Sequence, residues 1–192
     1  LTEKYPMARL EKALALIDAA NAADPNLDAG RPEALLYAER MTAEAARIFP
    51  AASDILRIAA RGQHVERWLL KRADFPEGKA GYHAWRREQG RRHAARVGQI
   101  MAEAGYDAAD QARVGVLLRK EGIKRDPDVQ ALEDIICLVF IRWYLAGFAA
   151  KRSAEDLKAI VEKTARKMSA QGRARVLAEF ELPPGLAAAF SP

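Results

Sequence analysis

The sequence is poor in cysteine, in aromatic residues and in long apolar runs. A single cysteine, Cys137, among 192 residues excludes an internal disulfide and fits a reducing compartment. The longest apolar run, residues 135–150, is interrupted by Arg142 and is shorter than the roughly 20 residues that span a bilayer. Residues 1–20 carry acids and bases throughout, so no signal peptide is expected. We therefore expect a cytoplasmic protein that does not interact with membranes.

Several catalytic and binding motifs are also absent. There is no glycine-rich phosphate loop, no His-Glu-x-x-His motif, no cysteine pair for zinc and no Glu-x-x-His pair of the ferritin kind. The single cysteine and the scarcity of serine argue against a nucleophilic triad. These absences exclude P-loop nucleotide hydrolases, HExxH-type zinc proteases and zinc-finger-like modules.

What is present indicates a helical protein. Half of the residues are hydrophobic, 30% are charged, and no alternating run of the strand type is found. Proline, glycine and helix-capping residues mark the helix ends. We predict an all-α fold, a compact single-domain bundle of seven to nine helices without a sheet, with a core over about residues 5–172 and a helical tail over 173–192. The expected helices cover approximately residues 6–23, 32–49, 53–71, 81–104, 107–120, 126–151 and 153–172, with one more short helix in the tail.

Positive charge is concentrated in one segment. Residues 57–96 contain eleven Lys and Arg and four acids, a net charge of +7, whereas the whole chain has +5 and the remainder therefore −2. This concentration indicates an anionic ligand. The alternative is that these arginines form the solvated faces of helices.

Two of the three histidines fall on apolar helical stripes. His64 follows Leu56 and Ala60 at a spacing of four, and His93 lies in a second stripe that reads Trp85, Gln89, His93, Val97, Met101. Both imidazoles are thus expected to face the core on neighbouring helices. His83 falls with Arg87 and Arg91, and we expect it to face solvent. The alternative for each core histidine is a packed side chain satisfied by one hydrogen bond.

An acid pair, Glu133 and Asp134, opens the most apolar helix of the chain. Beyond residue 134 that helix is apolar almost all round, so at least one carboxylate is expected to be partly buried, which is costly unless the carboxylate is paired or bound to metal. Two core-facing histidines and a buried acid on three helices are the parts of a metal site inside a bundle. Alternatively, the acids complement the helix dipole and pair with an arginine.

The order of these residues resembles the metal-binding layout of the HD superfamily, which is all-helical and contains phosphohydrolases, nucleotide hydrolases and a diiron oxygenase branch. His64, then His93, then Glu133-Asp134 follow its sequence of ligands, but Ala94 stands where the superfamily has an aspartate after the second histidine. The resemblance implies one divalent ion (Zn, Mn or Fe) held by His64, His93 and Asp134, with Glu133 as a substitute ligand. The loss of metal binding is the alternative that Ala94 leaves open.

A second resemblance covers nearly the whole chain. Residues 61–68, 81–86 and 132–140 resemble signature segments of an uncharacterised bacterial and fungal family, catalogued as domain of unknown function 4202, and residues 163–164 and 167–169 fit the same pattern. This resemblance supports the helical fold and names no reaction.

Cationic and aromatic residues lie close in sequence to the candidate ligands, and arginine forks bind phosphate in bidentate fashion. The candidate substrate-binding residues are Arg61, Arg67, Tyr82, Trp85, Arg86, Lys120 and Lys124. For Trp68 and Trp85 the alternative is plain core packing.

These features lead to a hypothesis with several alternatives. We expect a metal-dependent hydrolase acting on a phosphorylated or nucleotide-like anionic small molecule, with Glu133 and Asp134 as catalytic residues beside metal-bound water. An iron-dependent oxidase on the same ligands is a variant. The alternatives without catalysis are a helical module whose arginine-rich face binds nucleic acid or an acidic partner, and a plain scaffold protein.

Overall fold

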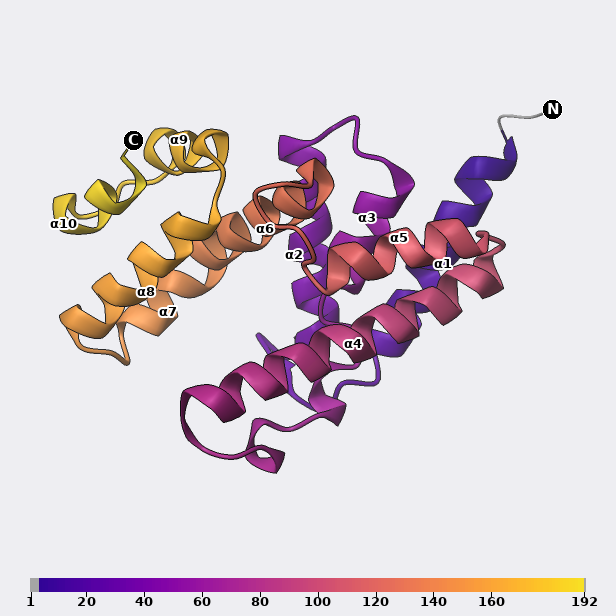
Figure 1. Ribbon diagram of the computed structural model, residues 1–192, viewed down its shortest axis with the longest axis horizontal. Helices are drawn as coiled ribbons and strands as arrows, with labels where there is room; N and C mark the ends of the chain where they lie inside the picture. Colours follow the sequence, from indigo (N-terminus) through magenta and orange to yellow (C-terminus); the bar gives the residue numbers. More distant parts are fainter. Residues whose placement is uncertain (1–3, 192) are drawn as a thin grey trace. The chain divides into compact units, whose positions relative to one another are not determined.

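The computed structural model describes residues 4–191, and its backbone is almost entirely helical (Figure 1). The prediction of an all-α fold is confirmed. The α-helices among these residues are α1 (Lys4–Asn21), α2 (Glu33–Ile48), α3 (Asp54–Gly62), α4 (Gly78–Ala104), α5 (Ala108–Leu118), α6 (Pro127–Val139), α7 (Leu145–Ala149), α8 (Ala154–Lys167), α9 (Ala170–Glu179) and α10 (Pro184–Ala187). The chain folds into two compact units, Leu1–Glu121 and Gly122–Pro192, which we call unit 1 and unit 2. The single-domain prediction and the likeness to the HD superfamily stay predictions.

Unit 1 contains α1 to α5 and a small hairpin that was not predicted. Strands β1 (Leu27–Asp28) and β2 (Arg31–Pro32) pair antiparallel across Ala29 and Gly30. Both turn residues have positive φ, 51° and 74°, as a two-residue hairpin turn requires. An alanine in this conformation is uncommon, which is why residues 27–32 carry no clear hairpin signal.

The core of unit 1 lies where α4 packs along α1 and α5 (Figure 1). Its fully buried side chains include Ile17, Met41, Ile58, Val97 and Met101. Each such side chain stabilises the fold by about 1.5–3 kcal/mol relative to exposure. This packing fixes α4, the helix that carries most of the candidate site.

The third helix is shorter than predicted. Instead of continuing to residue 71, α3 ends at Gly62, and the chain proceeds through two short 3₁₀ turns, η1 (Arg67–Leu69) and η2 (Arg72–Asp74). Glu66 has left-handed backbone (φ 51°), which breaks a helix. The expected helical stripe from Leu56 and Ala60 to His64 is therefore wrong at its end, because His64 lies in a turn beyond the helix.

Unit 2 contains α6 to α10. Helix α6 begins where predicted, because the Asp126 carboxylate accepts hydrogen bonds from the Asp128 and Val129 amides. It runs through a π-helical turn, η3 (Phe140–Tyr144), into α7, so the predicted sixth helix corresponds to this continuous run. The predicted seventh helix, residues 153–172, is too long at its end. Helix α8 stops at Lys167, because Met168 is extended and Ser169 caps the separate helix α9.

The core of unit 2 is built from α6, α8, α9 and the chain end. Its fully buried side chains include Leu132, Ile135, Leu138, Met168 and Phe190. None of the helices described over residues 4–191 combines the length and the apolar character needed to span a bilayer.

Candidate functional site

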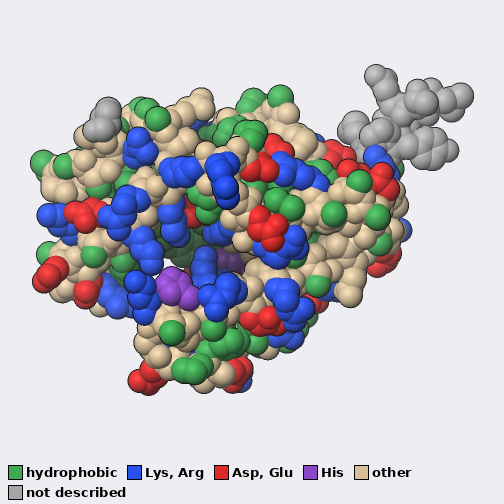
Figure 2. All heavy atoms as spheres, viewed as in Figure 1, with side chains coloured by type: hydrophobic (Ala, Val, Ile, Leu, Met, Phe, Trp, Pro, Cys, Tyr) green, Lys and Arg blue, Asp and Glu red, His purple; other side chains and the backbone are tan. Residues whose placement is uncertain are grey.

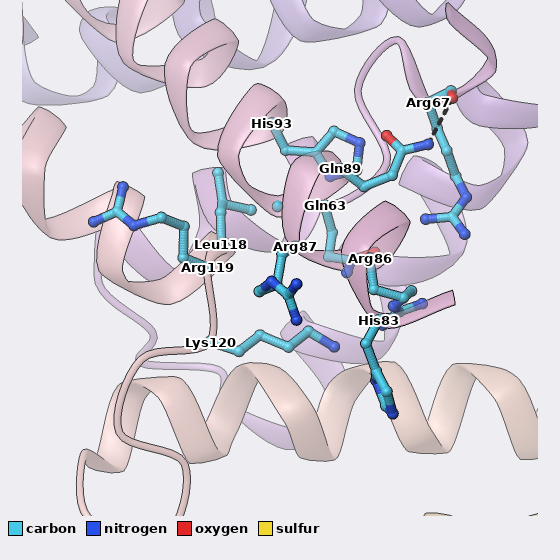
Figure 3. Close-up of a pocket in the computed structure, with 11 residues that line it drawn as sticks. Gln63, Arg67, His83, Arg86, Arg87, Gln89, His93, Leu118, Arg119 and Lys120 are labelled. Carbon is cyan, nitrogen blue, oxygen red and sulfur yellow. Dashed lines mark hydrogen bonds between the residues drawn. The ribbon is translucent and has the colours of Figure 1, made fainter. Parts of the chain in front are cut away.

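Unit 1 contains a pocket with a volume of about 210 Å³ (Figure 3). Its walls come from the turn after α3, from η1, from one face of α4 and from the end of α5. The described residues that line it are Gln63, Arg67, His83, Arg86, Arg87, Gln89, Gly90, His93, Leu118, Arg119 and Lys120. None of them is acidic.

Helix α4 supplies the largest share of the wall because its lining residues recur with the helical period. His83, Arg86, Gly90 and His93 are spaced by three or four residues and so share one face. Gly90 allows the end of α5 to approach closely, since a Cβ there would lie 3.3 Å from the Leu118 carbonyl oxygen. This close approach brings the α5 end, with Arg119 and Lys120, against the same face.

The backbone of Lys120 has left-handed geometry, with φ of 58°. A non-glycine residue pays about 1 kcal/mol or more for this conformation, and such residues cluster at functional sites. The left-handed turn ends α5 and places the lysine among the residues of the pocket.

The turn that carries Arg67 is held against α4 by several hydrogen bonds. Gln89 Nε2 donates to the carbonyl oxygens of Arg67 (3.0 Å) and Leu70 (3.1 Å), and Trp85 Nε1 donates to Leu70 (3.1 Å). Figure 3 shows the Gln89 side chain between His93 and Arg67. The Arg67 guanidinium lies 4.7 Å from the centre of the Trp85 ring, a cation–π contact.

Positive charge dominates the pocket. Arg67, Arg86 and Arg87 have no carboxylate within ion-pair distance among the described residues, whereas Arg119 pairs with Glu121 at 2.6 Å. Burial lowers the pKa of Arg67 to about 10, and the charge of Arg86 acts in the same direction. Figure 2 shows that Lys and Arg side chains are numerous on the face that it draws. The pocket is thus suited to an anion.

Two neutral imidazoles lie next to each other at this site. The ring centroids of His64 and His93 are 6.3 Å apart, and His64 stacks on Tyr37 at 3.8 Å. Burial lowers the pKa of His93 to about 3 and that of His64 well below 6.5, and the charges of Arg67 and Arg86 lower both further. Both rings are therefore neutral at pH 7 when no ligand is bound.

The sequence places this fold in a family. The family described as "Domain of unknown function (DUF4202)" matches residues 11–189, nearly the whole chain. The chain belongs to the DUF4202 family. No curated protein and no solved structure matches it. The family names no reaction, and every residue that lines the pocket lies inside the matched range.

The pocket of this family member brings together four of the predicted site residues. Arg67, Arg86, Lys120 and His93 line it, and His64 lies beside His93 but is only partly buried. The expected burial of His93 is confirmed, since its exposed fraction is 4%.

Four predicted binding residues do not line the pocket, and three of them, Arg61, Tyr82 and Trp85, belong to unit 1. Arg61 instead forms a two-pronged ion pair with Asp18, at 2.6 and 2.7 Å, and so ties α3 to α1. Trp85 supports Arg67 from behind, and Tyr82 contacts the rings of His83 and Trp85 with 38% of its surface exposed. Substrate binding by these three residues stays a prediction.

The sequence did not predict the two glutamines of the pocket or two of its arginines. Gln63, Gln89, Arg87 and Arg119 line the pocket. His83 lines it too and is exposed to solvent, as expected. The helical period of α4 indicates part of this set. Arg87 and Gln89 are sequence neighbours of Arg86 and Gly90, which lie on the face of α4 that lines the pocket. No sequence signal indicates Gln63 or Arg119, whose placement depends on how α3 and α5 end.

The predicted acids belong to unit 2, where Asp134 holds the start of α9. Asp134 Oδ1 accepts hydrogen bonds from the Ser169 amide (2.8 Å) and from Gln130 Nε2 (3.2 Å), and Oδ2 accepts from Ser169 Oγ (2.5 Å). A Cβ at Gly172 would lie 2.7 Å from Asp134 Oδ1, so this contact requires a glycine.

The other two predicted residues of unit 2 lie around the same turn. Lys124 Nζ donates to the Met168 carbonyl oxygen at 2.5 Å, and Glu133, 1% exposed, lies 3.5 Å from Lys167 Nζ. Both contacts help to position the connection between α8 and α9.

The donor set around the two histidines does not fit a metal ion well. The neighbouring arginines and Lys120 repel a divalent cation, and none of the described residues that line the pocket carries a carboxylate to compensate. Among residues 4–191, no group of three or more His, Cys, Asp or Glu side chains is arranged to hold a metal ion. Metal binding by His64, His93 and Asp134 stays a prediction, which metal analysis of protein purified without a histidine tag will test.

Proposed function

We propose that this protein binds a phosphorylated or nucleotide-like anionic small molecule in the pocket of unit 1. The observation that supports this most directly is the convergence of Arg67, Arg86 and Arg87 on a concave surface without a carboxylate partner among the described residues. Cations brought together in this way repel one another, and an anion removes the repulsion.

The chemistry of the cations favours phosphate. Guanidinium groups form paired, charge-assisted hydrogen bonds with phosphate oxygens, each worth about 1.5–3 kcal/mol. Arg67 is also held in place by the Trp85 ring, so less of its conformational freedom is lost when it binds.

The size of the pocket favours a small molecule over nucleic acid. Its volume of about 210 Å³ compares with roughly 300–1,000 Å³ for pockets that enclose drug-sized ligands. A nucleic-acid site would instead be an extended basic groove along the strand, with aromatic side chains on which the bases stack.

Hydrolysis of the bound molecule is the second part of the proposal, and it comes from the resemblance to the HD superfamily. The arginines would stabilise charge that develops on a transferring phosphoryl group. A neutral His93 would be able to orient a nearby water or hydroxyl through a hydrogen bond, since its lowered pKa makes it a weak base. Release of phosphate from phosphomonoesters and nucleotides tests this part separately from binding.

A thermal-shift comparison tests binding. At constant ionic strength, inorganic phosphate should raise the melting temperature of the wild type, and ligand at 100 times its dissociation constant adds roughly 2.7 kcal/mol of stability. Arg86→Gln should lose most of this shift. Arg57→Gln removes the same charge from an exposed position of α3 outside the pocket and should keep it. No shift at millimolar phosphate, or equal shifts in the two variants, would refute the proposal.

A further inference from the structure

The pocket has an inner wall of neutral polar side chains and an outer rim of cations. Gln63, Gln89 and His93 line it with exposed fractions of only 6, 3 and 4%. Arg67, Arg86 and Lys120 are partly exposed and Arg87 is exposed. A ligand that fills the pocket therefore meets charge at one end and uncharged hydrogen-bonding groups at the other.

Gln89 presents a hydrogen-bond acceptor to the ligand. Its Nε2 donates to two backbone carbonyl oxygens, which fixes the orientation of the carboxamide and leaves Oε1 as the acceptor. No described residue donates to Oε1, and Figure 3 shows this oxygen turned towards His93. An ionised phosphate or carboxylate oxygen cannot donate, so a second anionic group does not satisfy this position.

Gln63 and His93 add hydrogen-bonding groups that no described residue uses, both donors and acceptors. Gln63 Oε1 accepts a hydrogen bond from the Tyr37 hydroxyl at 3.1 Å, so its Nε2 is the group left to donate. Neither ring nitrogen of His93 is hydrogen-bonded to a described residue, and because Nε2 is completely buried, Nδ1 is the nitrogen that a ligand can reach. A neutral imidazole has one donor and one acceptor nitrogen. Hydroxyl groups match this mixture because each both donates and accepts, whereas an ammonium group would be repelled by the rim.

We infer that the ligand is a small phosphorylated polyol, with its phosphate on the rim of Arg86, Arg87 and Lys120 and its hydroxyls on the inner wall. This inference rests on the proposed function and narrows its substrate class. No Trp, Tyr or Phe side chain is among the described residues that line the pocket, so a nucleobase lacks an aromatic platform.

Calorimetric titration with matched phosphate esters tests the inference. The wild type should bind glycerol phosphate about tenfold more tightly than methyl phosphate, which corresponds to one or two net hydrogen bonds. His93→Leu should abolish this preference, because it should weaken the binding of glycerol phosphate more than the binding of methyl phosphate. The same substitution should raise the melting temperature, because it removes a buried polar group without a partner. A raised melting temperature shows that any loss of preference is not caused by unfolding.

The outcomes separate the inference from the proposed function. Equal affinity for the two esters, tighter binding of AMP than of glycerol phosphate, or a preference that survives His93→Leu would overturn the inference while binding of phosphate stands. If neither ester nor inorganic phosphate binds, the proposed function itself fails.

Discussion

His93 is a buried imidazole without a hydrogen bond to any described residue, and such a group destabilises a fold by about 1–3 kcal/mol unless a ligand or water satisfies it. Its burial was predictable from sequence, because Gln89, His93, Val97 and Met101 form one stripe and all are buried. The position of His64 was not predictable, because Glu66 adopts a left-handed conformation that no propensity indicates.

The two histidines predict how stability depends on pH. Above about pH 6.5 the imidazoles are neutral in both the folded and the unfolded chain. Below it the unfolded chain binds protons that the folded protein does not, since the folded pKa of His93 is about 3 and that of His64 is also lowered. We expect the free energy of unfolding to fall as the pH drops below about 6.5, by up to roughly 1.4 kcal/mol per pH unit for each histidine.

Urea unfolding between about pH 7.5 and about pH 5 measures this slope. His93→Leu should make the pH dependence of the free energy of unfolding shallower by the contribution of one histidine. The groups whose charges lower the pKa of His93 are Arg67, Arg86, Lys120 and Arg92. An identical slope in the wild type and the variant would show that His93 is not kept neutral by the fold.

At the scale of elements, α4 organises the site. Its extent was predicted to within three residues, and the predicted starts of the helices at residues 126 and 153 coincide with the capping residues Asp126 of α6 and Ser153 of α8. The loop that follows α3 was not predicted. It is held by the hydrogen bonds of Gln89 and Trp85 to backbone carbonyls, and such tertiary contacts leave no local pattern in the sequence.

The first turn of α4 depends on a glycine. A Cβ at Gly81 would lie 1.8 Å from the Pro76 carbonyl oxygen, and backbone atoms cannot move aside as a flexible side chain does. Gly81→Ala should therefore destabilise the protein by about 1–3 kcal/mol or more. Gly98→Ala is the matched control on the same helix, because nothing lies within 4 Å of its Cβ, and it should stabilise by about 0.5–1 kcal/mol.

Urea unfolding of the two variants gives the comparison. Equal stabilities would mean that the connection between η2 and α4 does not pack against Gly81 as described.

At the scale of the whole molecule, charge is the property that sequence conveyed best. The segment 57–96, with a net charge of +7, contributes eight of the residues that line the pocket, and this concentration was the basis for expecting an anionic ligand. The carboxylates expected to complete a metal site proved harder to interpret. A buried acid in sequence looks the same whether it binds metal or caps a helix, and Asp134 caps α9 through Ser169.

The central claim is that the pocket of unit 1 binds phosphate, and isothermal titration calorimetry with inorganic phosphate tests it most directly. We predict one saturable site per chain in the wild type and in Arg57→Gln, with at least a tenfold (about 1.4 kcal/mol) weaker site in Arg86→Gln/Arg87→Gln. The absence of saturable binding up to about 10 mM phosphate, or an unchanged affinity in the double variant, would contradict the account.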